Sequence, residues 1–186
     1  VWHLLVYVAT GPNVMALHLI GAGWAMLTGI VMCLVGLRLA GRAGFLLTGL
    51  LYAAAMADAA VRANVYPEIL MVLPLALGML ALAAGLSRGK TALVGVAGFC
   101  AELALLTKQT AAFSCLAMAV VVVLAHCFAA GIRGRGVLRR IATDWVALSA
   151  GGLLAALPWL VYVWQHHAGA GFMHNYVTGP AEYVTG

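Results

Sequence analysis

The chain alternates between long apolar runs and short polar breaks. Apolar runs occupy residues 14–39, 45–61, 69–86, 91–107, 111–132 and 145–164. Crossing the hydrocarbon core of a bilayer takes about 20 residues, within a usual range of about 17–25. Strands of a membrane barrel would be about 10 residues long and would alternate between polar and apolar positions, which these runs do not. The pattern therefore predicts an all-α fold, a polytopic bundle of about six spanning helices.

We expect residues 1–186 to form a single transmembrane domain that is an internal fragment of a longer protein. The chain starts at Val1 without an initiator Met or the basic segment of a signal peptide, and it stops in the polar stretch 178–186. Residues 1–10 would then be the end of a partial N-terminal element.

Composition excludes a soluble domain. The chain is 65% hydrophobic and 8% charged, with a mean hydropathy of +1.06, whereas about a quarter of a soluble domain is charged. The net charge of +5 does not indicate a nucleic-acid partner, because the basic residues are distributed by loop. The four cysteines lie inside apolar runs without metal-ligand spacing, so we expect them to be small buried residues.

The basic residues predict the orientation. Alternating the loops between two sides leaves only Arg62 and Lys108 on one side. The other side receives eight: Arg38, Arg42, Arg88, Lys90, Arg133, Arg135, Arg139 and Arg140. Because cytoplasmic loops carry the excess of Lys and Arg, this second side is predicted to be cytoplasmic, and the loops near Tyr66 and Lys108 extracytoplasmic.

Glycines and prolines predict the breaks between helices. Gly41 is expected to end the first helix, and residues 87–90 are too short for anything except a tight hairpin. Residues 132–140 would form the one long cytoplasmic loop and the main hinge, a basic anchor at anionic headgroups.

Two charged residues at the extracytoplasmic ends are the leading site candidates. Pro67 suits the first turn of a helix, so Glu68 would lie near a helix N-terminus, where the dipole favours a carboxylate. Glu68 could act as a base, a metal ligand or a sugar-hydroxyl acceptor, or simply cap the helix. Lys108, followed by Gln109, suits a phosphate at headgroup depth, and the alternative is an ammonium that reaches for lipid headgroups.

Other polar residues are weaker candidates. Asp58 and Arg62 are four apart and could pair, and Tyr66 lies in the same loop. Glu102 lies inside an apolar run, where it could bind a ligand or hydrogen-bond between helices. We expect His166 and His167 to contact substrate or the interface.

Adjacent histidines diverge on a helix, so no metal ligands are assigned, and a divalent metal stays an open alternative as cofactor. His18 and His126 are expected to be packing residues. Trp145, Trp159 and Trp164 are expected to be interface anchors.

Several segments together resemble the polytopic glycosyltransferases with a GT-C fold, in the bacterial branch related to protein O-mannosyltransferases and lipid A aminoarabinose transferases. The likeness covers roughly residues 1–130. Its segments are GPNVMALHLIG at 11–21, GLRLAGR at 36–42, ANVYPEI at 63–69 and GVAGFCAELALLTKQT at 95–110.

This resemblance implies an enzyme of the bacterial inner membrane with its active face extracytoplasmic. The donor would be a polyprenyl-phosphate-linked sugar, and the acceptor a lipid, a glycan or a protein. By motif, Glu68 matches an acidic position of the family, and Lys108 matches a lysine near the donor phosphate. The family's principal catalytic acid would lie upstream of Val1, so this fragment should be inactive alone.

The sequence thus favours a membrane glycosyltransferase over a transporter or permease. A transporter would use Asp58, Glu102 and Lys108 to line a pathway, and such proteins more often have interrupted helices in paired, inverted halves. The polar residues here cluster at the outer ends of the apolar runs instead.

Overall fold

The computed structural model describes residue 11 and residues 13–61, 67–130 and 135–173, and the regular structure in them is helical throughout. The elements are α2 (Val14–Val61), α3 (Pro67–Arg88), α4 (Thr91–Thr107), the 3-10 turn η1 (Gln109–Ala111), α5 (Ala112–Ala130), α6 (Arg135–Gln165) and α7 (Gly169–Met173). The predicted all-α class is confirmed for the described residues, none of which lies in a strand.

Four helical stretches are long and apolar enough to cross a membrane. They are His18–Ala57, Leu70–Arg88, Gln109–Phe128 and Gly136–Gln165. Thr91–Thr107 is also apolar but shorter, with 17 residues. Many large apolar side chains of α2 are exposed, for example Met26 and Leu50, each at 70%. Such exposure is expected where lipid tails replace water.

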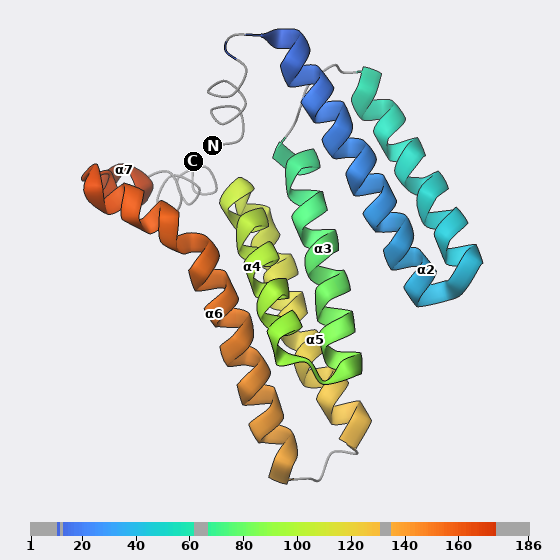
Figure 1. Ribbon diagram of the computed structural model, residues 1–186, viewed down its shortest axis with the longest axis vertical. Helices are drawn as coiled ribbons and strands as arrows, with labels where there is room; N and C mark the ends of the chain where they lie inside the picture. Colours follow the sequence, from blue (N-terminus) through green and yellow to red (C-terminus); the bar gives the residue numbers. More distant parts are fainter. Residues whose placement is uncertain (1–10, 12, 62–66, 131–134, 174–186) are drawn as a thin grey trace, which may run out of the picture.

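Helix α2 folds back on itself. Its ribbon reverses direction at Ala40 and Gly41, where Gly41 has φ 63° and ψ −149°, a conformation that a side chain would strain (Figure 1). Just before and after this turn the two halves nearly touch, since a Cβ added to Gly36 would collide with the carbonyl of Gly44, and the reverse also holds. The predicted end of the first helix at Gly41 is therefore confirmed.

The predicted hairpin at residues 87–90 is also confirmed. Helix α3 ends at Arg88 and α4 begins at Thr91, with Gly89 at φ 63° between them. The predicted long loop at 132–140 is wrong over most of its length, because α6 already begins at Arg135. Ile141 is buried, so a periodic apolar position overrides the glycines that suggested a break.

The helices run up and down, so their connections gather at two ends (Figure 1). One end holds the turn of α2, the α3–α4 turn, the last residues of α5 and the start of α6. We call it the basic end, because it carries the exposed side chains of Arg38, Arg42, Arg88, Lys90, Arg139 and Arg140. The opposite end, which we call the Lys108 end, holds the starts of α2 and α3, the α4–α5 turn and the end of α6. The described part of the chain thus follows the predicted alternation of loops.

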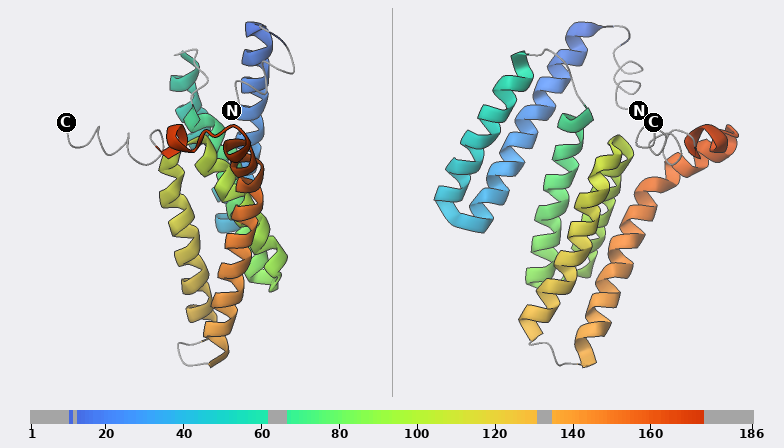
Figure 2. Two further views of the ribbon diagram at one scale, coloured as in Figure 1. Left: turned by 90° about the vertical axis from the view of Figure 1, so that its left-hand side faces the viewer. Right: turned by 180° about the vertical axis from the view of Figure 1, so that it is seen from behind.

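Helix α4 lies at the centre of the packing, against α3 on one side and α6 on the other (Figure 2). Its buried Val94, Ala97 and Ala101 form a cluster with Leu82 of α3 and with Met118 and Val122 of α5. The first half of α2 packs on α3 through Val31, Leu73 and Ala76. The second half of α2 lies on the outer side of the first (Figure 1).

Glycines let α4 and α6 approach backbone to backbone. A Cβ added to Gly98 would collide with the carbonyl of Leu148, and one added to Gly151 would collide with the carbonyl of Gly95. Small residues serve this purpose in lipid, where helices gain little from apolar burial and depend on close contact. The contact fixes where α6 crosses α4.

Replacing Gly98 by Ala should therefore loosen the bundle. We expect Gly98→Ala to lower the free energy of unfolding by about 1–3 kcal/mol, the usual cost of overpacking. Thermal unfolding of the detergent-solubilised chain, followed by tryptophan fluorescence, measures the change.

Gly136→Ala is the matched control, because a Cβ there meets nothing within 4 Å. It should be neutral or stabilising by up to about 1 kcal/mol, since alanine is the better helix former. Equal stability of the two variants would show that α4 and α6 do not pack through Gly98.

Candidate functional site

Lys108 occupies the turn between α4 and α5. Its backbone is extended (φ −153°, ψ 132°), its N–H donates to the Ala104 carbonyl at 2.9 Å, and its carbonyl accepts from the Ala111 N–H at 3.1 Å. The residue thus closes α4 and opens η1, and its half-buried side chain lies where one helix ends and the next begins. A cation is favourable at the C-terminus of a helix, and an anion at the N-terminus of the following one.

The α4–α5 turn touches the start of α3. The Thr110 hydroxyl lies 3.8 Å from the Met71 sulfur, which links η1 to the second turn of α3. Figures 1 and 2 show the two segments side by side at the Lys108 end. Lys108 and Gln109 directly precede Thr110, and Gln109 is half-buried.

Glu68 lies on the same helix as Met71. Helix α3 begins at Pro67, as predicted, so Glu68 lies in its first turn, three residues before Met71. The side chains of Asp58 and Glu68, and all of Arg62 and Tyr66, lie outside the described residues. The assignment of Glu68 as catalytic residue and of Arg62 and Tyr66 as substrate contacts therefore stays a prediction.

Glu102 belongs to a different surface. It is half-buried on α4 and lies against α6, since a Cβ added to Gly152 would be 3.8 Å from the Glu102 Oε2. Six residues of α-helix separate it from Lys108, about 9 Å along the axis. The structure therefore places Glu102 between two helices and not in the α4–α5 turn.

The two adjacent histidines finish α6. Its ribbon bends away from the bundle in the last third, where Pro158 interrupts the helical hydrogen bonds (Figure 1). The His166 ring lies 4.4 Å from the Tyr162 ring, and His167 takes a left-handed φ of 51° where the helix closes. Both histidine side chains are exposed at the Lys108 end, and the ring that His166 contacts belongs to its own helix.

In the part of the chain that the structure describes, no group of three or more His, Cys, Asp or Glu side chains could hold a metal ion.

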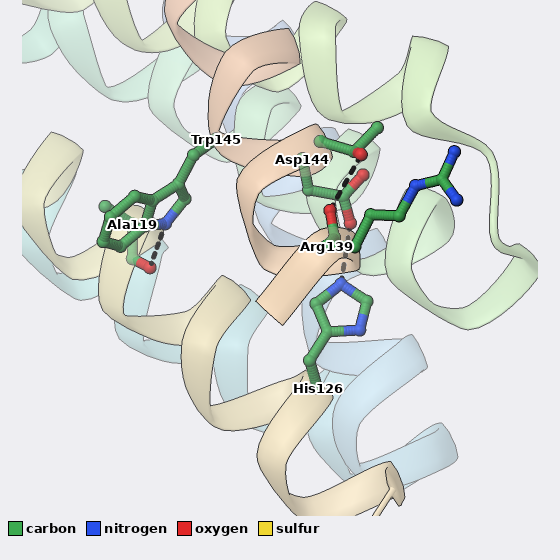
Figure 3. A network of polar contacts seen from close by, with 6 residues as sticks. Ala119, His126, Arg139, Asp144 and Trp145 are labelled. Carbon is green, nitrogen blue, oxygen red and sulfur yellow. Dashed lines mark hydrogen bonds and ion pairs between the residues drawn. The ribbon is translucent and has the colours of Figure 1, made fainter. Parts of the chain in front are cut away.

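Within the part of the chain that the structure describes, the most closely paired ionisable groups lie toward the basic end, where sequence reasoning did not place a site. The His126 Nε2 of α5 is 2.8 Å from the Asp144 Oδ2 of α6, and the two side chains are 18% and 11% exposed (Figure 3). Eighteen residues separate them, so no local spacing signals the pair. His126, which was expected to be a packing residue, is half-buried and also hydrogen-bonds a buried carboxyl group.

Trp145 makes a second link between the same helices. Its indole N–H donates to the Ala119 carbonyl of α5 at 3.1 Å, while the ring is 45% exposed (Figure 3). The indole N–H is thus satisfied by the backbone of the neighbouring helix, and the assignment of Trp145 as an interface anchor stays a prediction. Trp164 is 79% exposed at the opposite end of α6.

An apolar groove of about 470 Å³ lies between the two halves of α2. Met26, Ile30, Leu34 and Phe45 line it among others, and the Tyr52 hydroxyl spans it by donating to the Ala25 carbonyl at 2.8 Å. With almost no polar lining, this groove offers nothing for chemistry and is separate from the α4–α5 turn.

No protein-family model, curated protein or solved structure matches this chain. The likeness to GT-C glycosyltransferases therefore rests on the quoted segments alone.

The His126–Asp144 contact makes a test of the α5–α6 pairing possible. We expect His126→Leu to lower the free energy of unfolding by about 1–3 kcal/mol, because it leaves a buried carboxyl group without its partner. Asp144→Asn should cost less, since the amide oxygen can still accept from the imidazole. Thermal unfolding in detergent measures both.

The double variant His126→Leu/Asp144→Leu is the control that separates the pair from its parts. Removing both partners should recover much of the loss of the single histidine variant. If the losses of His126→Leu and of the matching single variant Asp144→Leu simply add up in the double variant, His126 and Asp144 do not interact.

Proposed function

We propose that this chain is part of an integral-membrane glycosyltransferase with six spans, α2 contributing two. The enzyme would transfer a sugar from a polyprenyl-phosphate donor to an acceptor on the extracytoplasmic face of a bacterial inner membrane. The Lys108 end is the proposed active face, and the basic end the cytoplasmic one.

One observation carries the proposal. The Thr110–Met71 contact holds the α4–α5 turn, with Lys108 and Gln109, against the start of α3, where Glu68 lies. This contact places a turn that carries a lysine beside the helix whose first turn carries a glutamate, at the end that is poor in basic residues, and it supports a site shared by Lys108 and Glu68.

The proposed chemistry is displacement at the anomeric carbon of the donor sugar. The acceptor hydroxyl attacks this carbon, the bond to the phosphate oxygen breaks, and the polyprenyl phosphate leaves with the electron pair. Glu68 would orient the acceptor or take its proton, as a general base does. Lys108 and the first N–H groups of the η1–α5 segment would stabilise the charge on the departing phosphate.

A transporter is the rival. Binding sites of transporters often lie near the midplane, where helices are discontinuous. Within the described residues, α3, α4 and α5 are continuous, and the non-helical break inside α2 lies at its end turn. Glu102 is the candidate that would suit a pathway, but it lies against Gly152 of α6. These observations favour an end-on site for a lipid-linked substrate.

Lys108 should matter most for the donor. We expect Lys108→Ala to weaken binding of polyprenyl phosphate about tenfold to hundredfold, since a hydrogen bond to a charged group contributes about 1.5–3 kcal/mol. Lys108→Arg should recover part of the affinity, because it keeps the charge but not the compact ammonium. Titration of the solubilised chain with polyprenyl phosphate measures these changes.

Glu68 should matter for turnover. In the complete enzyme, Glu68→Gln should lose most transfer activity while donor binding stays within about twofold, because a neutral amide cannot take a proton. Gln165→Ala is the control, an exposed polar residue at the same end with no assigned role. Unchanged donor binding by Lys108→Ala, or normal transfer by Glu68→Gln, would refute the respective assignment.

A further inference from the structure

Six cationic side chains gather at the basic end from separate parts of the chain. Arg38 and Arg42 flank the turn of α2, Arg88 and Lys90 flank the α3–α4 turn, and Arg139 and Arg140 lie near the start of α6. All six are exposed. Tight backbone features place four of them, because Gly41 and Gly89 adopt positive φ in the two turns.

These cations have no carboxylate partner within the described residues. Asp144 is the acidic residue near this end, and its carboxylate is occupied by His126 at 2.8 Å. Figure 3 shows the Arg139 side chain extending away from that pair. The His126–Asp144 contact therefore leaves the arginines available for an external anion.

Helix α6 places its arginines at the depth of lipid headgroups. Its 31 residues span about 46 Å, whereas the hydrocarbon core is about 30 Å thick. The surplus includes the first turns of the helix, since the apolar run begins only at Trp145. Arg139 and Arg140 lie about one and a half turns before it.

Large apolar side chains are also exposed at the basic end. Leu39 is 77% exposed beside Arg38, Leu138 is 75% exposed beside Arg139, and Phe128 is 83% exposed near the end of α5. A free anion would satisfy the cations and leave these side chains in water. An amphiphile satisfies both, with its headgroup on the cations and its acyl chains along the apolar side chains.

We propose that the basic end is a binding surface for anionic phospholipids. The headgroup phosphate would contact the exposed arginines, and the acyl chains would contact the flanking apolar side chains. The surface would fix the bundle in the leaflet that is rich in such lipids. It does not depend on the proposed transferase activity.

Native mass spectrometry of the whole chain, released from detergent with equal phosphatidylglycerol and phosphatidylcholine, tests this surface. We expect a preference of at least about fivefold for phosphatidylglycerol, the effect of about one basic residue near a charged surface. Arg139→Gln/Arg140→Gln and, independently, Arg38→Gln/Arg42→Gln should each lose most of it. Arg139→Lys/Arg140→Lys should keep most of it, since the charges remain.

Three outcomes would overturn the proposal. The first is equal binding of the two lipids by the unsubstituted chain, and the second is loss of the preference in the lysine variant. The third is retention of the preference in both glutamine variants, with melting temperatures equal to that of the unsubstituted chain. An excess of inorganic phosphate should reduce lipid binding no more than sodium chloride of the same ionic strength. A larger reduction by phosphate would identify a free-anion site instead.

Discussion

The close approach of α4 to α6 is the contact on which the rest of the arrangement depends. Gly98 and Gly151 bring the two backbones together with no room for a Cβ, and α4 in turn carries α3 on its other side. Lys108 directly follows the last residue of α4, so the position of this helix decides where the Lys108 turn lies. Small residues here replace the apolar burial that would hold a soluble bundle together, since lipid tails are as apolar as the side chains they meet.

From this packing follows a molecule with two chemically different ends. One end gathers arginines from three connections and has its nearby carboxylate occupied by a histidine. The other brings the start of α3 to the turn that carries Lys108 and Gln109. This separation fits a protein that uses one face for a lipid-phosphate substrate and the other for anchoring in the opposite leaflet.

Much of the fold could be predicted from local pattern. Run length and glycine position gave the ends of α4, the α3–α4 turn and the break at Gly41, because helix termination is decided by nearby residues. The start of α6 could not be found in this way, since Gly136 is tolerated in a helix whose Ile141 is buried against other elements.

The candidate site was predictable only in part. Pro67 and the isolated Lys108 mark helix ends, so their place at the same end followed from the alternation of spans. The contact between the α4–α5 turn and α3 is made by Met71 and Thr110, which are 39 residues apart, and no local pattern predicts it. The His126–Asp144 pair is likewise a product of how α5 and α6 pack, and neither residue has a local signal that would have found it.

The orientation of the two ends is the claim that everything functional depends on, and it can be measured directly. In a chain without its natural cysteines, Thr110→Cys and Ala170→Cys report on the Lys108 end, and Ser87→Cys and Gly136→Cys report on the basic end. Treating intact cells with a membrane-impermeant maleimide should label the first two positions and spare the last two until the membrane is opened. Labelling of Ser87→Cys and Gly136→Cys in intact cells, with Thr110→Cys protected, would contradict the account.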